Sequence, residues 1–255
     1  MLKANIETFL ACDASYEEAG IVLYGAPFDS TTSYRPGTRF GSRAIRSESY
    51  GLESYSPYQD RDLTDYAVFD AGDQELCFGD ASLALKDLRE RAVEVAGDGK
   101  IPFMLGGEHL VTLAPVQALA EKYPDLHIIH FDAHADLRDD YLGAKLSHAC
   151  VLRRCWEVLG DGRITQFGIR SGDREEWRWG KEHVTTHPFI VDMEVFRKLF
   201  GNWKENRCIL PWIWMCWIRV CFREQERRNR AESVLRNFDG QSRRSAVQLG
   251  LLDVM

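Results

Sequence analysis

The sequence predicts an α/β protein in which helices cover both faces of a parallel sheet. Over the first two thirds of the 255 residues, short apolar runs typical of buried strands alternate with longer amphipathic stretches typical of helices. Apolar residues make up 45% of the chain and charged residues 28%, which is enough apolar material for one large core. Strands that alternate with helices form parallel sheets that are buried on both sides.

Four strands are expected, and each runs into glycine, proline or polar residues. They are AGIVLYGAP (19–27), IPFMLGGEH (101–109), LHIIHFDAHADLR (126–138) and ITQFGIRSG (164–172). The glycines and the proline at the ends of the first two runs indicate turns. In an open parallel sheet, ligands bind beyond the carboxyl ends of the strands, so functional residues are expected there.

Two helices are expected between these strands. ASLALKDLRERAVEVAGD (81–98) has apolar residues at helical spacing and ends in a glycine-containing stop. LVTLAPVQALAEKYP (110–124) follows the second strand. The polar, glycine-bearing stretch 28–62 is long for a plain connection, so we expect it to shape a site.

Composition and charge favour a cytoplasmic protein. The first 20 residues hold too many acids and too short an apolar run for a secretory signal, and no run reaches the roughly 18 to 20 apolar residues that span a bilayer. Seven cysteines, an odd number without paired spacing, argue against a disulfide framework. We therefore expect a reducing compartment and no membrane segment.

The net charge of −7 is unevenly distributed along the chain. Residues 199–255 hold ten Lys/Arg and six Asp/Glu, a net +4. Basic clusters can neutralise nucleic-acid phosphates. A local excess of arginine is also common without any such role, and we expect no nucleic-acid partner.

Two motifs at expected strand ends carry candidate chemistry. GGEH places His109 just after a strand, where Gly106 and Gly107 let the backbone turn sharply. DAHAD places Asp132, His134 and Asp136 after the apolar run LHIIHF. A single histidine is more often a hydrogen-bonded structural residue than a ligand. The combination of D-x-H-x-D with GGEH favours a site.

The D-x-H-x-D spacing predicts a metal site. Alternate positions of an extended segment point to one side, so two carboxylates and one imidazole converge. Carboxylate oxygen with imidazole nitrogen suits Mn²⁺, and the lack of thiolates disfavours structural zinc. With His109 included, the carboxylates could bridge two ions about 3.5 to 4 Å apart, which generates a hydroxide nucleophile at neutral pH. Glu108 is expected to support the loop, and His130, on the other phase of the strand, to lie in the core.

Four stretches resemble the ureohydrolase family of arginases and agmatinases, and most closely its bacterial agmatinase branch. They are LYGAPFDSTTSYRPGTRFGSRAIR, FMLGGEHLVT, IIHFDAHADLRDDY and LSHACVLRR. The similarity runs from about residue 15 to about residue 198. It implies a three-layer α/β/α sandwich on a parallel sheet, with the C-terminal part incomplete in this chain.

The resemblance also implies a reaction and the residues that perform it. Agmatine and water would give putrescine and urea at a centre of two Mn²⁺ ions per subunit, and arginase or another guanidino-acid hydrolase is the alternative. The family's metal ligands fall on His109, Asp132, His134 and Asp136. Its proton-shuttling histidine falls on His148 of LSHA, which could otherwise be a surface loop residue. Partners would be a small guanidino substrate and further copies of the chain, since members form trimers or hexamers.

The segment LPWIWMCWIRVCFREQERRNRAE (210–232) fits none of this pattern. An aromatic anchor for a membrane or a partner is one interpretation. The segment is too short to span a bilayer, however, and its tryptophans follow no clean helical period.

A shifted reading frame explains the segment better. The family carries two more ligand aspartates in a motif D-x-D-x-x-D-P, and no such motif follows residue 198. Read one base earlier, the codons of WIWMCWI (212–218) encode D-[LM]-D-V-L-D, because Trp and Met have single codons. We therefore predict a ureohydrolase domain over 1–198 and an out-of-frame tail over 199–255. The literal chain would then be either an enzyme or a non-catalytic frameshifted product.

Overall fold

The computed structural model describes residues 7–191, 194 and 196. Within them, the longer strands form two parallel sheets of three strands each, in the orders β4-β1-β5 and β6-β7-β8. These strands are β1 (Ile21–Ala26), β4 (Val68–Asp73), β5 (Ile101–Gly106), β6 (Ile128–Phe131), β7 (Ile164–Ile169) and β8 (Thr185–Pro188). A short antiparallel pair joins β2 (Tyr55–Ser56) to β3 (Arg61–Asp62).

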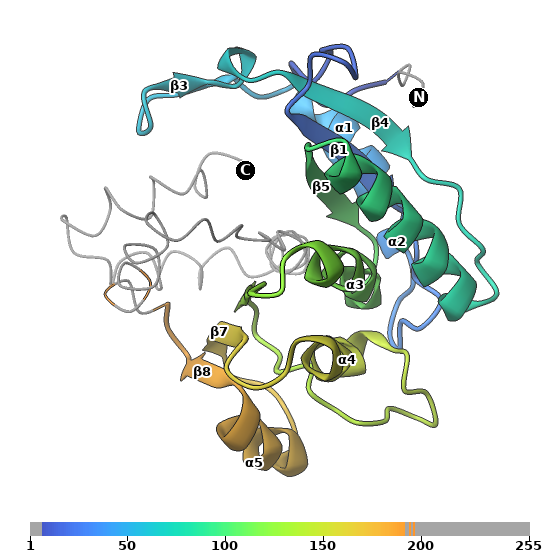
Figure 1. Ribbon diagram of the computed structural model, residues 1–255, viewed down its shortest axis with the longest axis vertical. Helices are drawn as coiled ribbons and strands as arrows, with labels where there is room; N and C mark the ends of the chain where they lie inside the picture. The colour runs from blue at the N-terminus through green and yellow to red at the C-terminus, as the bar shows by residue number, and fades with distance from the viewer. Residues whose placement is uncertain (1–6, 192–193, 195, 197–255) are drawn as a thin grey trace.

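Helices alternate with the strands, as the sequence predicts (Figure 1). The α-helices are α1 (Gly41–Ser49), α2 (Ala81–Gly97), α3 (Leu113–Lys122), α4 (Val151–Leu159) and α5 (Arg174–His183). Short 3-10 helices are η1 (Thr38–Phe40), η2 (Leu63–Asp65), η3 (His109–Thr112) and η4 (His148–Cys150). The expected α/β class is therefore confirmed.

Helices α1 and α2 cover opposite faces of the first sheet. Successive side chains of a strand point to opposite faces. In β1, Leu23 packs in the cluster that includes Ile45 of α1, whereas the next residue, Tyr24, packs in the large core cluster that includes Leu88 of α2. The sheet is thus the middle layer between two helical layers, as the family resemblance implies.

The four expected strands and two expected helices are present, with shorter bounds. The largest difference is at 126–138, where the strand ends at Phe131 and the polar residues after it leave the sheet. The expected helix 110–124 begins with the turn η3 before α3. The long polar stretch 28–62 contains η1, α1 and the β2–β3 pair, so it is partly regular structure.

A buried ion-pair cluster ties α1 to β4. Arg46 is 2% exposed, and its guanidinium donates to both carboxylate oxygens of Asp70 at 2.8 and 2.9 Å and to Asp73 Oδ1 at 2.5 Å. Asp70 also accepts from the backbone N–H groups of Phe9 and Gly72. Every charge in this cluster therefore has a partner.

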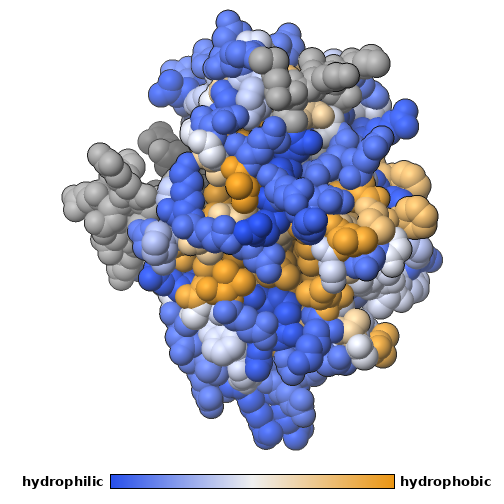
Figure 2. All heavy atoms as spheres, turned by 45° about the vertical axis from the view of Figure 1, so that its right-hand side comes forward, coloured by the Kyte–Doolittle hydropathy of each residue, from blue (hydrophilic) through white to orange (hydrophobic). Residues whose placement is uncertain are grey.

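In the part of the chain that the structure describes, no helix is both long enough and apolar enough to cross a bilayer. The face shown in Figure 2 is mostly hydrophilic, with several separate hydrophobic patches. Exposed apolar side chains include Phe40, Phe78 and Leu142.

Candidate metal centre

A glycine turn at the end of β5 brings His109 into the molecule. A Cβ on Gly107 would collide with backbone atoms of Ala26 and Phe28, so only glycine allows the two segments to lie this close. The Glu108 N–H donates to the Phe28 carbonyl at 2.7 Å, which holds the turn against β1. His109 then starts η3 with 2% of its surface exposed.

The DAHAD segment turns inward after β6. Asp132 and Asp136 are both buried, whereas the His134 side chain is 37% exposed. The segment is not a continuous strand, because Asp136 has a positive φ of 52°. Aspartate tolerates this left-handed conformation better than most residues. The turn thus redirects Asp136 relative to the alternation that the sequence predicts.

Side chains from the two motifs meet in one buried cluster. His109 Nδ1 lies 2.6 Å from Asp136 Oδ2. Donor atoms of His109, His130, Asp132 and Asp136 all lie within 4.8 Å of one another. Three of the four predicted ligands therefore come together. The fourth, His134, is next to them, with Nδ1 3.3 Å from Asp132 Oδ1.

The cluster has the properties of a cation site. Three buried atoms of the cluster have no hydrogen-bond partner in the described part of the chain. They are Asp132 Oδ2, His130 Nε2 and His134 Nδ1. Buried carboxylates are costly unless a positive charge compensates them. The donors are carboxylate oxygens and imidazole nitrogens without a thiolate, a set that suits divalent ions such as Mn²⁺. The residues present therefore fit the divalent metal that the sequence predicts.

Burial and neighbouring groups favour the ligand forms of these residues. Burial lowers the pKa of His109, although Asp136 acts in the opposite direction, so the imidazole favours its neutral form. Burial alone would raise the pKa of Asp132, but the neighbouring imidazoles of His130 and His134 hold it well below its usual range. A neutral imidazole and an ionised carboxylate are the forms that bind metals.

His130 is part of this cluster, and sequence reasoning placed it only in the core. It is 1% exposed, its Nε2 lies 3.5 Å from Asp132 Oδ2, and its ring stacks on His109 at 5.1 Å between centroids. Gln166 Nε2 donates to the Ala135 carbonyl at 2.8 Å and also contacts His130 Nδ1 at 3.0 Å. Since the Gln166 amide donates to Nδ1, the proton of His130 is on Nε2 and faces Asp132. The available signal was that His130 lies only two residues before Asp132 in the sequence.

His148 lies on η4, which packs against η3. It is 8% exposed, so it is not a surface loop residue. Its Nδ1 is 2.9 Å from the Thr31 carbonyl, and the Tyr141 ring meets its imidazole edge to face at 5.6 Å. The long polar stretch after β1 thus contributes to the surroundings of His148, as expected of a segment that shapes a site.

The arginase family model matches residues 19–199, a range that includes every residue of this cluster. The chain belongs to the arginase family. Agmatinase from Bacillus subtilis (strain 168) is 48% identical over 200 residues, which cover 77% of this chain and 69% of that protein. Agmatinase from Bacillus anthracis is 49% identical over 201 residues, with the same coverage.

Solved structures show the same arginase-family fold. A putative agmatinase from Clostridium difficile aligns with a TM-score of 0.71 and 45% identity, covering 74% of this chain and 68% of that chain. The agmatine ureohydrolase of Thermoplasma volcanium aligns with a TM-score of 0.68 and 37% identity, covering 79% and 67%. The predicted out-of-frame tail, 199–255, lies outside the described residues, and the family match ends at 199.

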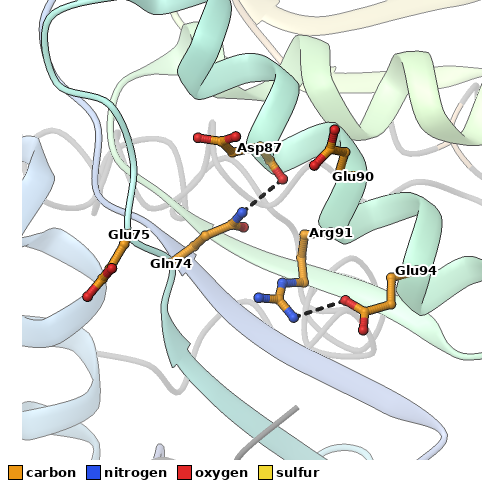
Figure 3. Close-up of a pocket in the computed structure, with 6 residues that line it drawn as sticks. All are labelled: Gln74, Glu75, Asp87, Glu90, Arg91 and Glu94. Atoms are coloured by element: carbon orange, nitrogen blue, oxygen red, sulfur yellow. Dashed lines mark hydrogen bonds and ion pairs between the residues drawn. The ribbon is translucent and has the colours of Figure 1, made fainter. Parts of the chain in front are cut away.

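An acidic pocket lies beside α2 (Figure 3). It is lined by Gln74, Glu75, Asp87, Glu90, Arg91 and Glu94. Gln74 Nε2 donates to the Asp87 carbonyl at 2.8 Å, and Arg91 pairs with Glu94 at 3.1 Å. None of its lining residues belongs to the metal cluster, and surface carboxylates of this kind are common without a ligand. We assign it no function.

Proposed function

We propose that this chain is a ureohydrolase of the agmatinase type, which converts agmatine and water to putrescine and urea. The observation that carries the proposal is the buried cluster of His109, Asp132 and Asp136, in a chain that is 48% identical over 200 residues to a protein named agmatinase. The proposed cofactor is a pair of Mn²⁺ ions, and the proposed ligands are His109, Asp132, His134 and Asp136. We further propose a cytoplasmic homo-oligomer.

The residues of the centre would divide the work of hydrolysis. Divalent ions held there would supply the positive charge that activates water and neutralises the two carboxylates. The water oxygen bonds to the guanidinium carbon and gives up its two protons, and the bond from that carbon to the alkyl nitrogen breaks. The nitrogen takes up the two protons and leaves as an ammonium group, and urea remains. His148 is the proposed carrier of protons to that nitrogen.

The guanidino compound is the finer part of the proposal. Agmatine is favoured because the B. subtilis and B. anthracis relatives are named agmatinase. A relative from Thermococcus kodakarensis, 42% identical over 168 residues, is named N(1)-aminopropylagmatine ureohydrolase, so a longer amine is a second candidate. Urea release from agmatine, aminopropylagmatine and arginine at equal concentrations tests the choice. Faster release from arginine would favour an arginase instead.

A second hypothesis is that the 255-residue chain itself is non-catalytic. It rests on the absence of a D-x-D-x-x-D-P motif after residue 198. Under this hypothesis the domain covers 1–198, the segment 199–255 is an out-of-frame tail, and only four of six ligands remain. Urea release by the purified 255-residue protein with added Mn²⁺ decides between the two. Turnover at an ordinary enzymatic rate would refute the second hypothesis.

The matched control is a gene in which the insertion or deletion of one base near codon 200 restores the reading frame. If the frame prediction holds, the corrected protein releases urea at least 100-fold faster, because it regains both missing carboxylates. Resequencing codons 190–255 from an independent template then tells whether the corrected frame already exists in nature. An unchanged sequence together with an active 255-residue protein would contradict the frame prediction.

A further inference from the structure

Three segments far apart in the sequence meet around His148. Glu108, at the start of η3, is 2% exposed and lies against Thr31 in the stretch after β1. Its carboxylate accepts from the Thr31 N–H at 2.7 Å and from the Thr31 hydroxyl. Both oxygens of a buried carboxylate are therefore used to hold one residue, Thr31.

Thr31 in turn holds His148 at two points. The His148 backbone N–H donates to Thr31 Oγ1 at 3.2 Å, and His148 Nδ1 lies 2.9 Å from the Thr31 carbonyl oxygen. The hydroxyl thus donates to Glu108 and accepts from His148, which uses both of its roles. If Thr31 moves, both the backbone and the ring of His148 lose a partner.

These contacts determine which ring nitrogen carries the proton. A carbonyl oxygen only accepts hydrogen bonds, so the 2.9 Å contact requires a proton on Nδ1. Glu108 Oε2 lies 3.6 Å from the same nitrogen. An unprotonated Nδ1 would point its lone pair at two oxygen atoms, one of them a carboxylate oxygen. In neutral His148 the lone pair is therefore on Nε2.

We propose that Glu108 and Thr31 are positioning residues that hold His148 as its Nδ1–H tautomer, so that Nε2 can carry a proton to the leaving amine. The inference rests on the proposed function and deepens it. Nε2 takes up one proton and releases it to the departing nitrogen, so the ring returns to its starting form in each turnover. While the ring carries the extra proton, the Glu108 carboxylate stabilises its positive charge. A third side chain orients the catalytic base in the same way in hydrolases that use a nucleophile and a base.

The first test reads the tautomer directly. Nitrogen NMR of the full 255-residue chain, with histidine selectively labelled with ¹⁵N, distinguishes Nδ1–H from Nε2–H, and a His148→Ala variant identifies the signals. We expect His148 to show the Nδ1–H form. Thr31→Val keeps the backbone carbonyl but loses the hydroxyl that donates to Glu108 and accepts from the His148 N–H. Without this anchor the carbonyl should no longer hold the ring, which should exchange between the two tautomers, whereas Thr31→Ser, which keeps the hydroxyl, should retain the wild-type spectrum. An Nε2–H form in the wild-type protein would overturn the proposal.

The second test separates positioning from metal binding, because Glu108 precedes His109. Thr31→Val and Glu108→Gln should each lower kcat about tenfold, less than the roughly 100-fold or more that a general acid–base group itself contributes, because they act only through His148. KM for agmatine should change little, and bound Mn²⁺ should equal that of the wild type. Ser30→Ala is the control, since the side chain of this exposed neighbour donates to the Phe78 carbonyl, away from Glu108 and His148. A loss of bound Mn²⁺ that accounts for the loss of rate would overturn the proposed role.

Failure of the proposed function has a different signature. If the wild-type chain binds Mn²⁺ but releases no urea from any guanidino compound, the proposed function fails. The tautomer measurement then still decides whether Glu108 and Thr31 position His148. A wild-type Nδ1–H signal that survives Thr31→Val unchanged would show that these residues do not set it.

Discussion

Two buried clusters of charged side chains in the described residues, one around Arg46 and the other the metal cluster, differ in how their charges are balanced. In the Arg46 cluster, one guanidinium donates to both oxygens of Asp70 and to Asp73, and backbone N–H groups complete the partners of Asp70. In the metal cluster, two carboxylates lie among imidazoles, and an Asp132 oxygen has no hydrogen-bond partner in the described residues.

The difference indicates what each cluster does. Taking charges out of water costs several kcal/mol per ion, so a folded protein retains them only where something compensates. In the Arg46 cluster, the guanidinium of the chain itself balances the charge of the carboxylates. The cluster joins α1 to β4, so its role is structural. In the metal cluster the carboxylates contact histidines, which carry a positive charge only when protonated. A divalent ion bound among neutral imidazoles would compensate the carboxylates, which is the property of a binding site.

The largest expected effect concerns the Arg46 cluster. Arg46→Met leaves Asp70 buried without its counter-charge, so the free energy of unfolding should fall by about 3 to 5 kcal/mol. Urea denaturation followed by circular dichroism measures the change. Arg89→Met is the matched control, because Arg89 pairs with Glu121 at the surface, and it should cost less than about 1 kcal/mol. Equal losses in the two variants would contradict the comparison.

The second effect concerns the metal cluster. Mn²⁺ at about 100 times its dissociation constant should raise the free energy of unfolding by about 2.7 kcal/mol, because only the folded chain brings the ligands together. Asp132→Asn should abolish this increment, whereas Arg46→Met should lower stability with or without Mn²⁺. Thermal unfolding with added Mn²⁺ or EDTA provides the measurement. An undiminished increment in Asp132→Asn would remove that residue from the ligand set.

A smaller effect is expected at His130. If it supports Asp132 through Nε2–H, as its contact with Gln166 indicates, His130→Leu should weaken Mn²⁺ binding about tenfold. His130→Gln keeps an N–H donor near the same place and should weaken binding less. Isothermal titration compares the two variants. Equal losses would mean that His130 binds the metal itself.

The smallest effect concerns a histidine that avoids the cost of charge by staying neutral. Burial, with a contribution from Arg163, lowers the pKa of His127 from 6.5 to about 4. Between these values the unfolded chain binds a proton that the folded chain does not, so stability should fall as pH drops from 6.5 to 4 and level off below. The group is partly exposed, so solvent screening keeps the loss near 1 kcal/mol. Denaturation against pH should show a shallower slope for His127→Gln.

The sequence predicted much of this protein because several of its signals are local. The apolar runs of β1, β5, β6 and β7 and the helical spacing of α2 and α3 are visible without tertiary information. Strands β4 and β8 were not predicted. The burial that makes β4 a strand depends on pairing with β1, and β8 pairs with β7.

The site divides in the same way. Residue type and spacing identified His109, Asp132, His134 and Asp136 as candidates, and the family resemblance added His148. The frame argument for 199–255 rests on codons and stays a prediction. Only the tertiary structure brought His130 into the cluster, turned Asp136 through a left-handed backbone and moved Thr31 next to His148. Such contacts join residues up to 117 positions apart. No local pattern encodes them, because they depend on how strands and turns pack together.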